Sequence, residues 1–369
     1  MMQTQASLIS VIVPAYNAQQ LIARTLMSVL NQTYRHIEVW VVDDGSRDRT
    51  SKIVEVIAKQ DDRVRLLQQP NAGVASARNL GIQSAQGEFI ALIDSDDLWY
   101  PDALEKLVAQ FQRSLSAVGV IYAWSLDVDE HDRPIGGFHA ATIKGNVYKT
   151  LICHNFLGNA SATLIRKDCL DHVGGYDTQL KAQKAQGCED WDLYLRLAEH
   201  YEFGVVPEFL IGYRKVASSM SRDFSQMARS QQFMLQSIQK NHPELSGYLY
   251  RLSRSSFYLY LAQQCNVYGD ARETLSWLWQ AVKADPISSL GRLGLYILLI
   301  KNLAKLAGKS WRLLRIWKLF IPPRLPIKDL SMNESLSPPI YPLSLPIHPL
   351  KIWLKVMVGS LLHKSLSKI

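Results

Sequence analysis

Four consecutive residues, Asp94, Ser95, Asp96 and Asp97, combine types and spacing that suit metal and phosphate chemistry. They follow directly after the apolar run 89–93. Because side chains alternate faces along an extended segment, Asp94 and Asp96 should point the same way from the end of a buried strand. Two such carboxylates repel each other unless a cation lies between them, and hard divalent cations prefer carboxylate and phosphate oxygens. The pattern therefore predicts a metal-diphosphate site, with an acidic turn before a capped helix as the alternative.

Three further segments near the N-terminus have the same layout, an apolar strand followed by small polar residues. They are 9–17, 37–46 and 64–73, and a helical pattern of apolar residues follows each one. This alternation predicts an α/β fold with a parallel sheet that has helices on both faces. In such sheets ligands bind at the carboxyl ends of the strands. The candidate ligand-binding residues at these ends are Asn17, Asp43, Asp44, Asp94 and Asp96.

Six motifs occur in an order and spacing that resemble family 2 glycosyltransferases of the GT-A fold. They are ISVIVPAYNA at 9–18, VVDDGSRDRT at 41–50, NAGVASARN at 71–79, LIDSDD at 92–97, GGYD at 174–177 and GCEDWDLYLRLA at 187–198. The resemblance covers about residues 7–215, and the agreement in order makes it more specific than any single motif. It implies a GT-A nucleotide-sugar-binding sheet, followed in this chain by an α-helical C-terminal region.

The resemblance implies that one group of residues binds the nucleotide sugar. This group is Pro14, Ala15, Tyr16, Asn17, Asp43, Asp44, Arg78, Asp94, Ser95 and Asp96. Asp44, with Asp43 beside it, would accept the ring N–H of uracil or thymine, because a carboxylate only accepts; a turn and helix cap is the alternative. Arg78 would bind a phosphate or ribose oxygen, or else form a structural salt bridge.

The same resemblance assigns the metal and the catalytic base. Asp94 would bind the ribose hydroxyls, and Asp96 would ligate a Mn²⁺ or Mg²⁺ ion that neutralises charge on the leaving diphosphate. In the family, the second acid of a Glu-Asp pair deprotonates the acceptor hydroxyl, and that residue here is Asp190. Glu189 and Trp191 would then lie on the acceptor side. The alternative is that both acids only favour the helix dipole.

Length and composition predict further segments after the catalytic domain. The predicted organisation is a catalytic domain at 1–220, a helical extension with one tetratricopeptide-like helix pair at 221–286, basic amphipathic helices at 287–320, a Pro-rich linker at 321–350 and a basic amphipathic C-terminal helix at 351–369. A single repeat cannot bury both of its faces. The helix pair is therefore expected to pack on the catalytic domain, and a partner-binding role stays open.

The net charge of +8 is distributed unevenly. Residues 301–369 contain twelve Lys or Arg and only Asp329 and Glu334 as acids, so the preceding residues are slightly acidic. Trp and Leu accompany the basic residues, which is the composition of cationic helices at membrane surfaces. The run 293–300 is much shorter than the ~20 apolar residues needed to span a bilayer. We expect this tail to bind an anionic membrane surface. Nucleic acid is the competing anionic partner, and we do not expect the tail to bind it.

The four cysteines, at positions 153, 169, 188 and 265, do not have the spacing of metal ligands. The N-terminus does not show the charged and apolar regions of a signal peptide. We therefore expect a cytoplasmic protein that associates peripherally with the inner face of the membrane.

These observations together predict a metal-dependent, inverting glycosyltransferase. It would move a sugar from a UDP- or TDP-sugar to a hydroxyl of a glycan or lipid-linked acceptor in cell-surface polysaccharide synthesis. One alternative is transfer to a polyprenyl phosphate, an acceptor that is already an anion and needs no base. Another is a non-catalytic nucleotide-binding scaffold that acts through the helical region.

Overall fold

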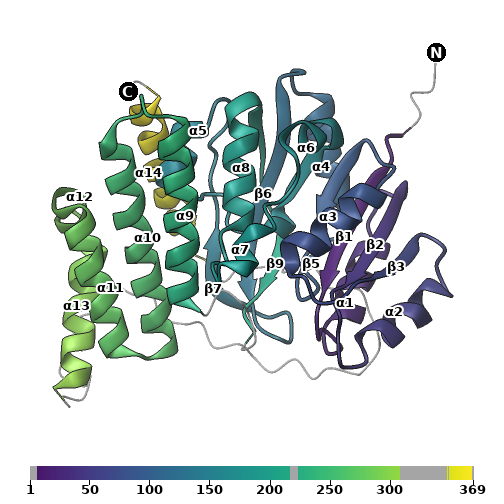
Figure 1. Ribbon diagram of the computed structural model, residues 1–369, viewed down its shortest axis with the longest axis horizontal. Coiled ribbons are helices and arrows are strands. Elements are labelled where there is room, and N and C mark those ends of the chain that lie inside the picture. The colour runs from purple at the N-terminus through teal and green to yellow at the C-terminus, as the bar shows by residue number, and fades with distance from the viewer. Residues whose placement is uncertain (1–5, 217–222, 308–346, 348, 368–369) are drawn as a thin grey trace. The chain divides into compact units, whose positions relative to one another are not determined.

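The computed structural model describes residues 6–216, 223–307, 347 and 349–367 (Figure 1). Most of the predicted Pro-rich linker 321–350 lies outside the described residues, as does the part of the predicted basic helices after residue 307. The chain forms two compact units. Unit 1 comes from the segments 1–151, 155–219 and 337–369, and unit 2 comes from 152–154 and 220–336.

Parallel strands form the first half of the sheet in unit 1. They are β1 (Ile9–Ala15), β2 (Ile37–Asp43), β3 (Val64–Gln68) and β4 (Phe89–Leu92). Their spatial order is β3-β2-β1-β4, and each neighbouring pair is parallel. β1 is buried along its whole length, as a continuous apolar strand with both faces covered should be. The predicted parallel α/β arrangement is confirmed here.

The second half of the sheet mixes parallel and antiparallel pairs. Its strands are β5 (Leu98–Trp99), β6 (Val118–Val128), β7 (Pro134–His139), β8 (Thr163–Arg166) and β9 (Glu202–Arg214). β8 lies antiparallel between β4 and β6, whereas β6 and β9 are parallel. The full order is β3-β2-β1-β4-β8-β6-β9-β5, with β7 paired to β6. Pairing of β8 with β4 brings the segment before β8 next to the acidic residues that follow β4.

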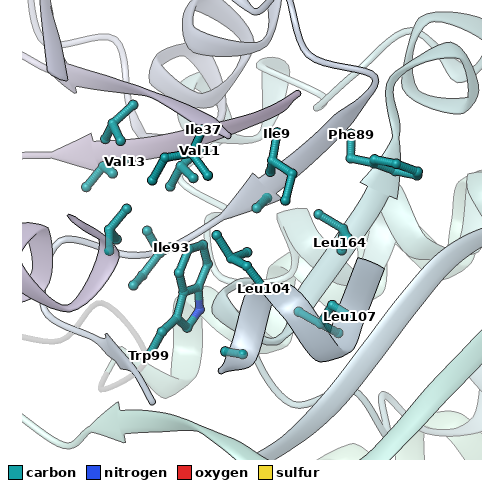
Figure 2. Close-up of a cluster of buried hydrophobic side chains, with 14 of the residues drawn as sticks. Ile9, Val11, Val13, Ile37, Phe89, Ile93, Trp99, Leu104, Leu107 and Leu164 are labelled. Atoms are coloured by element: carbon teal, nitrogen blue, oxygen red, sulfur yellow. The ribbon is translucent and has the colours of Figure 1, made fainter. Parts of the chain in front are cut away.

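Helices cover both faces of this sheet. They are α1 (Ile22–Leu30), α2 (Thr50–Ala58), α3 (Val74–Ser84), α4 (Ala103–Gln112), α5 (Tyr148–Cys153), α6 (Lys167–Val173), α7 (Gln179–Ala182) and α8 (Glu189–His200), with a 3₁₀ turn at Ala160–Ala162. Val11 and Val13 of β1 belong to a core cluster (Figure 2). Leu26 of α1 is a further member of this cluster. Ile12 points to the opposite face, because side chains alternate along a strand, and there it contacts Gly81 of α3.

Unit 2 is a helical unit, and unit 1 ends in a further helix. The helices of unit 2 are α9 (Phe224–Asn241), α10 (Gly247–Tyr268), α11 (Ala271–Ala284), α12 (Pro286–Leu290) and α13 (Leu293–Leu306). α10 and α11 lie side by side and are joined at Gly269, whose φ of +92° favours glycine (Figure 1). The additional helix of unit 1 is α14 (Pro349–Leu366). In the described part of the chain, every helix is too short or too polar to cross a bilayer.

Candidate active site

The predicted site residues lie at the carboxyl ends of β1, β2 and β4 and at the first turns of α3 and α8, all within unit 1. Pro14 and Ala15 are the last residues of β1. Tyr16 follows with 48 % of its surface exposed. Asn17 has a φ of +50°, and its N–H donates to the Ser46 hydroxyl at 2.9 Å. The loop after β1 is thereby fixed to the loop after β2 and leaves the ring of Tyr16 accessible.

Asp43 and Asp44 are both buried, and the chain itself supplies hydrogen-bond donors to each of them. Asp43 Oδ1 accepts from the Ser46 N–H at 2.9 Å, and Oδ2 accepts from the Ser51 hydroxyl. These bonds close the turn and link it to the first turn of α2. Asp43 therefore closes the turn that the alternative describes but caps no helix, because the N-cap position of α2 is Arg49 and has no side-chain cap bond.

Asp44 holds the loop before α3. Its Oδ1 accepts from Gln69 Nε2 and from the Ala72 N–H, both at 2.7 Å, and its Oδ2 accepts from the Gly73 N–H at 2.8 Å. Gly73 has a φ of +94°, a conformation that side chains with a Cβ rarely adopt. A carboxylate has about four acceptor positions. These three bonds leave room for one more donor.

Arg78 links the acidic segment after β4 to the first turn of α8. Its buried guanidinium donates through Nη2 to Asp94 Oδ1 at 2.6 Å and through Nη1 to Asp190 Oδ1 at 2.7 Å. The guanidinium carbon also lies 5.1 Å from the centre of the Tyr176 ring. Arg78 therefore forms the salt bridge that the sequence left as the alternative to phosphate binding. This pair of bonds brings together two acids that are far apart in the sequence.

Ser161 ties the acidic segment after β4 to the start of β8. The Asp94 N–H donates to the Ser161 hydroxyl at 3.0 Å, and that hydroxyl donates to Asp97 Oδ2 at 2.5 Å. Asp97 is completely buried. One side chain thus fixes both ends of the segment 94–97.

Thr25 and Arg214 hold the other side of the same segment. The Thr25 hydroxyl lies 3.0 Å from the carbonyl oxygen of Ser95 and 2.7 Å from that of Asp97. Arg214 Nη1 donates to the carbonyls of Asp96 and Asp97 at 2.8 and 3.0 Å, and the Arg214 N–H donates to Asp97 Oδ1 at 3.0 Å. The backbone of the acidic turn is therefore fixed by two donor side chains as well as by Ser161.

The electrostatics of the acidic segment are unfavourable without a counter-charge. Burial and repulsion by Asp94 raise the pKa of Asp96 to about 6. Burial, with repulsion by Asp96 and Asp94, also raises the pKa of Asp97 well above its usual range. Arg214 and Arg78 lower the pKa of Asp96 by less than burial and Asp94 raise it. A bound cation would relieve this repulsion.

The carboxylate of Asp96 fits a hard divalent cation that would also be held by the oxygens of a diphosphate. Within the described ranges, no three His, Cys, Asp or Glu side chains are grouped as a metal cage. Mg²⁺ is commonly held by one or two carboxylates together with substrate phosphates rather than by protein ligands alone. Asp96, whose pKa is raised beside Asp94, is suited to be such a carboxylate.

Asp190 lies in the first turn of α8 with its side chain 25 % exposed. Its Oδ1 accepts from Arg78 and, at 3.0 Å, from the Tyr176 hydroxyl. Burial and repulsion by Asp94 raise the pKa of Asp190, while Arg78 and the Tyr176 hydrogen bond oppose the rise. A partly accessible carboxylate with a raised pKa can act as a base at neutral pH.

The neighbours of Asp190 in α8 face inward. Glu189 is buried, its Oε2 accepts from the Gly187 N–H at 2.7 Å, and burial raises its pKa. Trp191 is only 4 % exposed, and its ring N–H donates to the Leu151 carbonyl at 2.7 Å. Both residues therefore support the start of α8 in the structure, although the sequence places them on the acceptor side.

Tyr176 belongs to the GGYD motif, but the motif alone does not indicate a role for it. Its N–H donates to Asn79 Oδ1 at 2.8 Å and its carbonyl accepts from Asn79 Nδ2 at 2.9 Å. Gly174 and Gly175 precede it with φ values of +83° and +71°, so the backbone bends there in a conformation that favours glycine. The bend and Asn79 together direct the Tyr176 hydroxyl to Asp190.

Arg214 is the second residue that supports the site although no sequence motif indicates it. Its side chain is 1 % exposed, and its Nε donates to Asp132 Oδ1 at 2.5 Å. Asp132 also pairs with Arg24 of α1 and has a φ of +64° in the turn between β6 and β7. The ion pair of Asp132 with the end of β9 depends on the pairing of β6 with β9 in the sheet.

Residues 10–174 match the family described as glycosyl transferase family 2. This segment belongs to that family. The GT-A type α/β fold predicted from the motifs is confirmed, and the described C-terminal part of the chain is helical. The family 2 segment contains all the predicted nucleotide-side residues, and Asp190 lies just after it.

Proteins similar to this chain include a chondroitin synthase and a glycosyltransferase. Chondroitin synthase from Escherichia coli is 30 % identical over 194 residues, which are 52 % of this chain and 26 % of that protein. Glycosyltransferase GlyG from Streptococcus pneumoniae is 44 % identical over 108 residues, which are 29 % of this chain and 36 % of that protein. The chain thus spans about a third or less of the length of these relatives.

Two solved structures resemble a larger part of this chain. Residues 1–349 of TarS from S. aureus, in complex with UDP, align with a TM-score of 0.52 at 19 % identity and cover 82 % of this chain and 93 % of that one. The mannosyltransferase PcManGT from Pyrobaculum calidifontis, in complex with GDP-Man and Mn²⁺, aligns with a TM-score of 0.51 at 20 % identity and covers 86 % and 85 %. At these identities the likeness concerns the fold.

Proposed function

We propose that this chain is an inverting glycosyltransferase. It moves a sugar from a UDP- or TDP-sugar to a hydroxyl of a glycan or lipid-linked acceptor in cell-surface polysaccharide synthesis. The observation that carries the proposal is the placement of Arg78 between Asp94 and Asp190, at 2.6 and 2.7 Å. One cation thereby aligns the acid on the donor side with the acid that serves as base.

The donor end is formed by the loops after β1, β2 and β4. Tyr16 offers an exposed ring to the flat nucleotide base, and Asp44 keeps one acceptor position for the ring N–H of uracil or thymine. Asp94 binds the ribose, and Asp96 would hold the Mn²⁺ or Mg²⁺ ion. When bound, the ion would stabilise the charge on the departing diphosphate. The complexes of TarS with UDP and of PcManGT with GDP-Man and Mn²⁺ support a nucleotide-sugar donor and a metal cofactor.

The acceptor end is organised around Asp190. Arg78 and Tyr176 both bond to Oδ1, so neither of them occupies Oδ2, which would accept from the acceptor hydroxyl. Asp190 takes the hydroxyl proton while the acceptor oxygen forms a bond to the anomeric carbon and the bond from that carbon to the diphosphate breaks. The raised pKa of Asp190 favours a hydroxyl acceptor over a polyprenyl phosphate, because an anionic acceptor needs no base.

The relative affinities of four nucleoside diphosphates test the donor end of the proposed site. Calorimetry with UDP, TDP, CDP and GDP in the presence of Mn²⁺ should show binding of UDP and TDP. CDP should bind more weakly by about 1–3 kcal/mol, because cytosine would face the buried Asp44 carboxylate with an acceptor. A preference for GDP would overturn the pocket. A screen for nucleotide-sugar hydrolysis would then identify the sugar.

We also propose that the chain associates peripherally with an anionic membrane surface. The support is the concentration of positive charge, together with Trp and Leu, in residues 301–369. Sedimentation with anionic vesicles at increasing salt tests the association. Binding that does not weaken with salt, or stronger binding to DNA than to vesicles, would contradict it.

A further inference from the structure

One face of α14 packs on the catalytic unit through apolar contacts. Ile352 lies against a buried cluster in unit 1. The buried members of this cluster are Leu98, Tyr100, Leu126, Val128 and Ile347. Leu98 and Tyr100 come directly after the acidic segment 94–97. The helix is therefore an integral part of unit 1 and packs against β5, the strand that follows this segment.

Polar bonds fix the same face of α14 along its length. Lys355 Nζ donates to the Phe138 carbonyl at 2.5 Å and lies 4.7 Å from the centre of the Phe138 ring. Nearer its C-terminal end, the His363 ring nitrogen Nδ1 lies 2.7 Å from the Thr150 hydroxyl of α5, and α14 lies beside α5 (Figure 1). Positions 352, 355, 359 and 363 recur at helical spacing and define this inward face.

The opposite face of α14 is also apolar, and it is exposed. Its large apolar side chains are 44–59 % exposed, and they are Leu350, Trp353, Leu354, Val358 and Leu361. The spacing of 350, 354, 358 and 361 places them along one side of the helix. Exposed Lys351 and Lys364 flank this outward face, and α14 contains no Asp or Glu. The sequence predicts one apolar face for this helix, whereas the structure gives it two.

An exposed apolar face of this kind indicates a partner, and its charges indicate which one. A second copy of α14 would bring Lys351 and Lys364 against the same cations, and such like-charge contacts are unfavourable. Anionic lipid headgroups would pair with these lysines while the acyl region accepts the leucines. Trp353 at the border of the face suits the headgroup level.

We infer that the outward face of α14 lies on an anionic lipid bilayer. Its inward face packs on the catalytic unit and so attaches that unit to the bilayer. This inference rests on the membrane association proposed above and assigns it to one helix of unit 1. Since the inward face contacts the residues that follow the acidic segment, lipid binding would hold this side of the catalytic unit close to the membrane. The catalytic unit would then bind the membrane through a helix that is packed on it.

The test compares two full-length variants with the same added charge. Leu354→Glu with Leu361→Glu changes the outward face only. The matched control is Leu115→Glu with Val267→Glu, two side chains that are 77 % and 68 % exposed elsewhere. Each protein is sedimented with vesicles made of equal parts phosphatidylglycerol and phosphatidylcholine. Binding of the outward-face variant should fall about tenfold or more relative to the control.

Two readouts separate the other outcomes. Equal sedimentation of the two variants would overturn the inference. Light scattering without vesicles measures the oligomeric state. A wild-type dimer, a monomeric outward-face variant and unchanged vesicle binding would together overturn the inference and indicate that the outward face joins two copies of the chain. UDP calorimetry on the same proteins should show no difference between the variants. Absence of UDP binding in all of them would contradict the proposed transferase function and leave the vesicle result standing.

Discussion

Two acidic clusters lie at the same edge of the sheet, and they differ in how their charges are stabilised. Asp43 and Asp44 accept hydrogen bonds from backbone N–H groups, a serine and a glutamine, so their charges are stabilised by the chain itself. In the segment 94–97 the backbone is held firmly, but Asp94 and Asp96 repel each other and burial raises the pKa of Asp96 to about 6.

The acids of the two clusters therefore have different roles. A carboxylate whose acceptor positions are mostly filled is a rigid part of the fold and offers one directional contact. The repulsion on a carboxylate that is partly buried beside like charge is relieved further when a cation or substrate binds. We expect changes in the first cluster to affect mainly stability and base recognition, and changes in the second to affect metal binding and catalysis.

The largest expected effect is on the second cluster. Asp96→Ala removes the carboxylate that would ligate the metal, so transfer should be abolished. UDP binding should weaken strongly with Mn²⁺ present and little with a chelator, because only the metal-bridged contact is lost. Calorimetry in both conditions measures the difference.

Asp171→Ala is the control for that variant, because this acid pairs with Lys167 on the surface of α6. It should bind UDP as the wild type does. If the wild-type chain binds UDP equally well with and without metal, Asp96 is not a metal ligand.

A smaller effect is expected in the first cluster. Asp44→Asn replaces one carboxylate oxygen by an amide that cannot accept, so the N–H of Ala72 or of Gly73 loses its partner. An unsatisfied buried N–H costs about 1–3 kcal/mol. The midpoint of chemical unfolding should fall accordingly, whereas the exposed Asp62→Asn should leave it unchanged. A normal midpoint for Asp44→Asn would show that the loop does not depend on these bonds.

The smallest effect expected is a shift in pH dependence. Tyr176→Phe removes the hydrogen bond that lowers the pKa of Asp190 but keeps the ring beside Arg78. The pKa of Asp190 then rises, so the acid limb of kcat, where the base becomes protonated, moves to higher pH. A hydrogen bond of about 0.5–1.5 kcal/mol corresponds to about one pH unit or less.

A pH profile of kcat at saturating donor and metal checks this shift. Tyr201→Phe is the matched control, since its hydroxyl bonds to His172 and not to Asp190. A limb that stays in place for Tyr176→Phe would mean that Asp190 does not set it.

The sequence could predict the elements that carry local signals. Continuous apolar strands, each followed by small polar residues, predicted β1 to β4 and the acidic segment after β4, and the six motifs predicted the fold. The insertion of β8 between β4 and β6 had no such signal, because strand order depends on contacts between distant segments. Ser161 is consequently brought to Asp94 and Asp97 by a pairing that periodicity does not encode.

The supporting residues were missed for the same reason. Arg214 reaches the acidic segment from the end of β9, and Asp132 pairs with it from the turn before β7. Charge composition likewise predicted a basic C-terminal helix, but not that α14 packs on unit 1 with one apolar face and exposes another. Only the tertiary contacts separate these two faces.

The claim that Asp190 is the catalytic base is tested most directly by comparing Asp190→Asn with Asp192→Asn. The asparagine at 190 can still accept from Arg78 and Tyr176, whereas Asp192 pairs with Arg196 on the same helix. Transfer rate and UDP affinity are measured for both. We predict that Asp190→Asn lowers kcat by about 10²–10⁴-fold with UDP affinity unchanged, and that Asp192→Asn changes neither. Full activity in Asp190→Asn, or loss of UDP binding in parallel with loss of transfer, would contradict the assignment.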